Sequence, residues 1–148
     1  MDNFIKTMAA AFGAVFAFFA GLSPVIWILL GAMSIDYITG LLCAAMGKSP
    51  KTEGGGLSSR AAREGLVKKV MVLMLVALSA LVDLAIASSA GLVGFNAITG
   101  AVCLWFIASE GLSVIENMGE MGVKFPPKLR KALEVLRDAG DDDEPPDA

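Results

Sequence analysis

The chain has 148 residues, of which 55% are hydrophobic and only 18% are charged, and its mean hydropathy is +0.67. Soluble domains carry roughly 25% charged residues. Histidine, the commonest general base and metal ligand, is absent from the sequence. The composition argues against a soluble enzyme, and we expect an integral membrane protein that needs no catalytic group, metal or cofactor.

Charged residues are nearly absent from two long stretches of the chain. Asp36 is the only charged residue between positions 7 and 47, and Asp83 is the only one between positions 70 and 109. Each stretch has about 40 residues, roughly twice the ~20 that a helix needs to cross a ~30 Å hydrocarbon core. A chain this short could not bury both stretches in a soluble core. The pattern predicts an all-α, polytopic membrane protein with about four transmembrane helices.

The first apolar stretch contains its own turn sequence. Gly21-Leu22-Ser23-Pro24 divides it into expected helices at about 4–20 and 25–46. The first of these helices is short for a membrane span, so it could instead lie partly in the membrane interface.

A polar segment at 48–63 separates the second expected helix from the third, which we place at about 66–88. The segment contains Gly54-Gly55-Gly56, which lacks the spacing of a phosphate-binding loop and is expected to be a flexible linker. An uncharged turn then leads to a fourth helix at about 92–108. That turn could also lie a few residues later, at 94–96.

The C-terminal part of the chain is expected to be helical but outside the membrane. Polar residues recur every three to four positions from Glu110 onwards, which extends the fourth helix toward Gly119 and Gly122. Two prolines then open a basic amphipathic helix suited to an anionic membrane surface or a partner helix. The expected organisation is a transmembrane domain at 1–110, a cytoplasmic amphipathic segment at 111–139 and a disordered acidic tail at 140–148.

Basic residues predict the orientation. They cluster at the N-terminus, in the central polar segment and in the C-terminal segment, and the two remaining turns carry none. Lysine and arginine beside a span resist translocation. An even number of helices puts all three basic regions on one side, so both termini are expected in the cytoplasm. This explains the basic central segment without a nucleic-acid partner.

Three acidic residues are the candidates for a pore or an assembly contact: Asp36, Asp83 and Glu110. An ionised carboxylate at the centre of a span costs at least ~2.5 kcal/mol unless it is sheltered. The alternative is that each is protonated or hydrogen-bonds a neighbouring helix, with Thr39, Ser79 and Asn96 as nearby polar partners. The two apolar stretches contain no basic residue, so we expect the partners of these carboxylates in another subunit, in the backbone or in water.

Small residues form a stripe along the first expected helix. Ala9, Gly13, Ala17 and Gly21 recur every four positions. Small residues allow close approach of helices in lipid, so the stripe is a candidate for packing within the chain or between copies of it.

Three stretches, in this order and spacing, resemble the bacteriophage holin family that includes the toxin-secretion holins of clostridia. They are Ile35-Asp36-Tyr37-Ile38-Thr39-Gly40, the stretch from Ser58-Ser59 to Gly65-Leu66-Val67-Lys68-Lys69, and Ala108-Ser109-Glu110-Gly111-Leu112 continuing to Asn117. Pro126-Pro127-Lys128-Leu129 also follows the family pattern.

The resemblance implies a phage protein that accumulates in the host cytoplasmic membrane and oligomerises into lesions. An endolysin (a peptidoglycan hydrolase), or in relatives a toxin, then crosses the membrane through these lesions. The expected partners are the bilayer, further copies of the chain and that functionally coupled hydrolase or toxin. Two other functions stay open: a small ion channel or solute transporter that uses Asp36, and a non-conducting anti-holin or scaffold.

Overall fold

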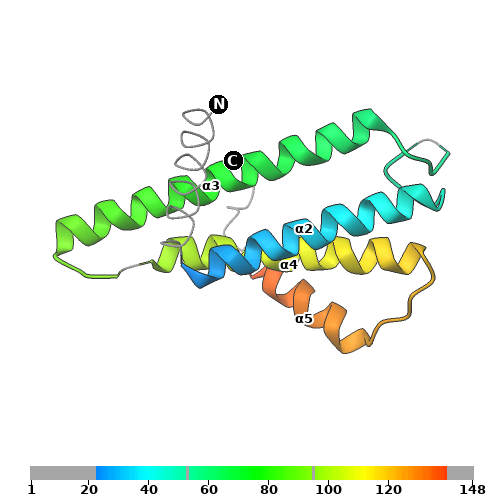
Figure 1. Cartoon of the computed structure of the whole chain (residues 1–148). Coiled ribbons are helices and arrows are strands. Elements are labelled where there is room, and N and C mark those ends of the chain that lie inside the picture. Colours follow the sequence, from blue (N-terminus) through cyan, green and yellow to red (C-terminus); the bar gives the residue numbers. More distant parts are fainter. Residues whose placement is uncertain (1–22, 53, 95, 140–148) are drawn as a thin grey trace, which may run out of the picture.

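A computed structural model of the protein describes residues 23–52, 54–94 and 96–139, which form four helices and no strand. The helices are α2 (Pro24–Ala45), α3 (Ser59–Ala90), α4 (Ala97–Glu120) and α5 (Pro127–Asp138) (Figure 1). The all-α prediction is confirmed for these residues. The helix expected at 4–20 and the acidic tail expected at 140–148 lie outside the described residues.

Three of the four described helices are long and apolar enough to cross a membrane: α2, α3 and α4. They contain 22, 32 and 24 residues. At 1.5 Å per residue they are about 33, 48 and 36 Å long, against ~30 Å for the hydrocarbon core. The described part of the chain therefore has three candidate membrane spans, and it fits the expected polytopic organisation.

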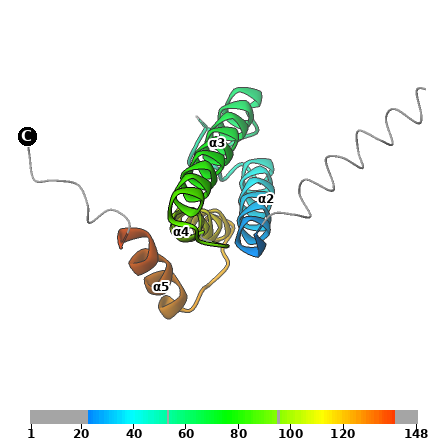
Figure 2. The same ribbon diagram turned by 90° about the vertical axis from the view of Figure 1, so that its left-hand side faces the viewer.

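Helix α4 lies at the centre of the described structure. Helices α2 and α3 both pack against it and have little contact with each other, while α5 packs on another side of α4 (Figure 2). The small apolar core lies where the three long helices meet. Its buried members are Ile26, Leu29, Met33, Val76 and Cys103.

Helix α3 begins before the apolar segment that we predicted at 66–88. Its first residue is Ser59, and the side chain of Ser58 accepts a hydrogen bond from the Ala61 amide at 3.3 Å. Serine is a favourable N-cap, and the alanine, arginine and glutamate that follow are good helix formers. The first turns of α3 are therefore helical although they are polar, and hydropathy alone did not reveal them.

The turn between α3 and α4 adopts the later of the two positions that the sequence allowed. Gly91 and Gly94 both have positive φ angles, of 66° and 72°, and α4 begins only at Ala97. The start expected near residue 92 is therefore wrong. Glycine tolerates this left-handed backbone without steric cost, which is why the chain reverses there.

Helix α4 then continues without a break to Glu120, as the polar periodicity beyond Glu110 predicted. Gly122, with φ of 93°, ends it, and α5 folds back against α4. At the contact between the two helices, a Cβ atom on Gly111 would lie 3.1 Å from Cδ1 of Leu133. The absence of a side chain at Gly111 therefore allows this close approach.

The loop between α2 and α3, which includes the expected flexible linker, forms hydrogen-bonded turns. Ser49 donates its amide to the Gly55 carbonyl, and Gly55 donates to Thr52, each at 3.0 Å. A Cβ on Gly55 would come within 2.2 Å of the Gly47 carbonyl oxygen. Glycine at position 55 therefore lets the loop fold close to the end of α2.

The outer surface of the membrane-spanning part of the bundle is largely apolar. Along α3 the exposed side chains over most of its length are large and hydrophobic: Val67, Met71, Met74, Leu78, Leu81 and Leu84. Serines in the spans donate to carbonyls of their own helices, as Ser34 does to Leu30 and Ser109 does to Trp105. Internal hydrogen bonding of polar groups is what a hydrocarbon environment requires.

Candidate functional site: an ionic cluster between three helices

The three long helices each contribute one charged side chain to a single cluster. Lys69 of α3 donates from Nζ to Oδ2 of Asp36 in α2 at 2.8 Å, and it also donates to Oε2 of Glu110 in α4. One ammonium group thus joins two carboxylates that lie 33 and 41 residues away in the sequence. The cluster ties α2, α3 and α4 together.

Neutral polar groups complete the site on the side of Asp36. The side-chain amide of Asn117 in α4 donates to Oδ1 of Asp36 at 3.1 Å and to the Thr39 hydroxyl oxygen at 3.3 Å. The Thr39 hydroxyl donates to the Asp36 backbone carbonyl. Both oxygens of the Asp36 carboxylate therefore accept hydrogen bonds from neighbouring helices.

The cluster is largely shielded from the surface. The side chains of Asp36, Lys69 and Glu110 are 11%, 14% and 12% exposed. Removing one member of a buried ion pair leaves an uncompensated charge and typically costs about 3–5 kcal/mol, whereas replacing the whole pair by neutral residues is often harmless. The cluster therefore favours the arrangement in which its three helices stay together.

Asp83 lies apart from this cluster and has a different role. Its carboxylate accepts hydrogen bonds from the Ile98 amide at 3.1 Å and from the Thr99 amide at 2.7 Å and hydroxyl at 2.6 Å. These amides belong to the first turn of α4, where backbone N–H groups have no partner within the helix. The side chain of Asn96, which precedes α4, makes no such bond, so Asp83 caps α4 from α3.

Two of the three predicted site residues, Asp36 and Glu110, thus lie in the ionic cluster, whereas the third, Asp83, caps α4. For Asp83, the expectation of a partner in the backbone is confirmed. For Asp36 the expectation of a partner in another subunit, in the backbone or in water is wrong, because the side chains of Lys69 and Asn117 of the same chain bind it. In the sequence, Lys69 belongs to the basic region that borders a span, and that position alone does not indicate an acidic partner. Its position within α3 makes its long side chain reach inward.

Asn117 was also missed as a member of the site. It lies two turns after Glu110 on the same face of α4, and the polar periodicity that predicted the helical extension was the available signal. The small-residue stripe at Ala9, Gly13, Ala17 and Gly21 lies outside the described residues and stays a prediction.

Comparison with known proteins gives the family. The model of the bacteriophage holin family matches residues 13–138. Lin0175, an uncharacterized protein of Listeria innocua, is 30% identical over 97% of this chain and 95% of its own length. A 14.9 kDa uncharacterized protein of Clostridium perfringens is 27% identical over 90% and 93% of the two chains.

A relative with a functional name comes from a virus. The probable holin of Bacillus phage phi105 is 32% identical over 72% of this chain and 70% of its own length. No solved structure matches the chain. Because the family model covers most of the sequence, including all three helices of the ionic cluster, the chain belongs to the bacteriophage holin family.

Proposed function

We propose that the protein is a holin that accumulates in the bacterial cytoplasmic membrane and then oligomerises into lesions. These lesions release an endolysin or a toxin, and the protein performs no catalytic chemistry. The observation that carries this proposal is the ionic cluster of Asp36, Lys69 and Glu110, enclosed by three apolar helices of a holin-family chain.

The cluster suits a protein that must exist in two states. In the dispersed protomer, Lys69 binds both carboxylates and the apolar segments of the spans expose large hydrophobic side chains, so these segments are compatible with lipid. The same charged groups would stabilise a lesion if they turned toward water or toward a neighbouring subunit. A polar group that is buried in one state and hydrated in the other is a typical element of a two-state switch.

The proposal predicts permeabilisation by this chain alone. Expression in a bacterium should collapse the membrane potential and stop growth, and the cells should lyse only when a peptidoglycan hydrolase accumulates in the cytoplasm. A potential-sensitive dye and the release of the hydrolase measure the two steps. Membrane-inserted protein that changes neither would contradict the holin proposal and favour an anti-holin or a scaffold.

The same experiment separates a holin from a small ion channel or transporter. A channel collapses the membrane potential but retains a folded hydrolase, because the hydrolase is far larger than any hydrated ion. Loss of potential without hydrolase release would therefore favour the channel.

A second prediction concerns orientation, for which we propose that both termini are cytoplasmic. Single cysteines replace the exposed residues Pro50, Ser89 and Glu120, in a chain whose buried Cys43 and Cys103 are changed to alanine. In intact cells an impermeant thiol reagent should label position 89 and leave positions 50 and 120 unlabelled, since those two lie beside the basic regions.

Permeabilised cells supply the control, because all three cysteines should then react. Labelling at position 50 in intact cells, before any lesion forms, would reverse the proposed orientation.

A further inference from the structure

A cavity of about 350 Å³ opens between α2, the start of α3 and α4. It exists because α2 and α3 pack on α4 rather than on each other. Part of its wall is apolar, and this part includes Leu41, Val72 and Phe106. Residues of the α2–α3 loop also line it, so the cavity lies at the end of the bundle where the basic segment meets the spans.

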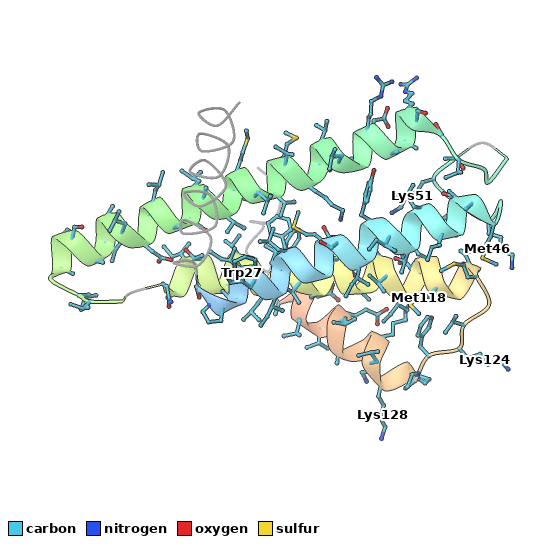
Figure 3. The ribbon with its side chains drawn as sticks, in the orientation of Figure 1. Trp27, Met46, Lys51, Met118, Lys124 and Lys128 are labelled. Carbon is cyan, nitrogen blue, oxygen red and sulfur yellow. The ribbon has the colours of Figure 1, made fainter. Side chains whose placement is uncertain are left out.

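Two lysines at this cavity, Lys51 and Lys68, lie outside the ionic cluster. Among the described residues neither Lys51 nor Lys68 forms an ion pair, and both residues are exposed. Lys51 extends from the loop toward α4 and donates to the Ser113 hydroxyl at 3.3 Å (Figure 3). Asp36 and Glu110 also line the cavity, but both are bound to Lys69. The opening therefore offers two positive charges to a ligand.

Trp105 adds a hydrogen-bond donor that has no acceptor in the described ranges. It lines the cavity, and its Nε1 is buried with no partner among the described residues. A buried indole N–H usually finds an acceptor, so this donor is a polar group of a cavity-lining residue that the described residues leave unsatisfied. Within the described part of the chain, the cavity thus combines two ammonium groups that form no ion pair, one indole N–H without an acceptor and an apolar wall.

We propose that this cavity binds an anionic phospholipid, with the headgroup phosphate against Lys51 and Lys68 and the acyl chains along the apolar surfaces of α2 and α3. Basic pockets between spans at a membrane boundary are suited to such headgroups. The helix expected at 4–20, whose only charged residue is Lys6, would leave both lysines without an anionic partner, and a free phosphate ion would leave the apolar wall exposed. This site goes beyond the proposed function, because the dispersed protomer would bind the lipid without forming a lesion.

Fluorescence of Trp105 provides the test. The Trp27→Phe variant has Trp105 as its only tryptophan, and it is reconstituted as dispersed protein in lipid nanodiscs. Brominated phosphatidylglycerol should quench Trp105 with roughly tenfold higher apparent affinity than brominated phosphatidylcholine, because only the first carries a net negative charge. Equal quenching by the two lipids, or quenching by neither, would overturn the proposal; the latter points to a protein segment in the cavity.

Two double variants with the same change of charge make the test specific. K51Q/K68Q should lose the preference for phosphatidylglycerol, whereas K124Q/K128Q should keep it, since Lys124 and Lys128 point away from the bundle (Figure 3). Millimolar inorganic phosphate should leave the preference unchanged. Loss of the preference in phosphate would assign the cavity to a free anion instead. Because none of these measurements requires a lesion, their outcome is independent of the permeabilisation experiment.

Discussion

Replacing Lys69 with methionine is expected to lower the free energy of unfolding by about 3 kcal/mol, the lower end of the range for a broken buried ion pair. Methionine preserves an unbranched side chain but leaves Asp36 and Glu110 facing each other without a cation. For a chain of this size the melting temperature should fall by roughly 10 °C. Thermal unfolding of the detergent-solubilised protein, followed by circular dichroism, measures the change.

The neighbouring residue provides a matched control. Lys68→Met makes the same chemical change at an exposed position that forms no ion pair among the described residues, so the melting temperature should stay close to that of the parent. The triple variant D36N/K69M/E110Q should recover most of the lost stability, because it removes all three charges of the cluster and leaves no uncompensated carboxylate buried. If Lys69→Met and Lys68→Met melted at the same temperature, the cluster would contribute nothing to holding the helices.

Substitutions of Asp36 are expected to have the largest effect on lesion formation. Asp36→Asn retains the size and hydrogen bonding of the side chain but not its charge, and Asp36→Leu removes both. Each variant should still insert, because the remaining pair of Lys69 and Glu110 is neutral. If the charge stabilises the lesion, both variants should collapse the membrane potential about 10- to 100-fold more slowly, from the ~1.5–3 kcal/mol of a charge-assisted hydrogen bond.

The two variants also distinguish charge from hydrogen bonding. If only the hydrogen bonds matter, Asp36→Asn should permeabilise normally and Asp36→Leu should fail. Asp83→Asn is the control for carboxylate loss elsewhere, and it should have a smaller effect because asparagine also caps a helix N-terminus. Normal timing for both Asp36 variants, at matched membrane levels, would show that Asp36 has no part in the lesion.

The sequence alone determined the membrane class and much of the helical organisation. Two stretches with one charge each can be stable only in lipid, and turn residues such as Pro24 and Gly91 mark where helices begin and end. The periodicity after Glu110 also predicted the continuation of α4. These features are local, because hydropathy and backbone preference depend on neighbouring residues in the chain.

The tertiary structure alone decided which polar residues belong together. Lys69 and Asp36 are far apart in the sequence, and whether they meet depends on how α2 and α3 are rotated against α4. Asp83 could have joined the same cluster, but its position along the axis of α3 places it beside the first turn of α4. The rotation of each helix about its axis and its axial shift relative to its neighbours are set by packing between helices. The one-dimensional pattern of each helix does not contain them.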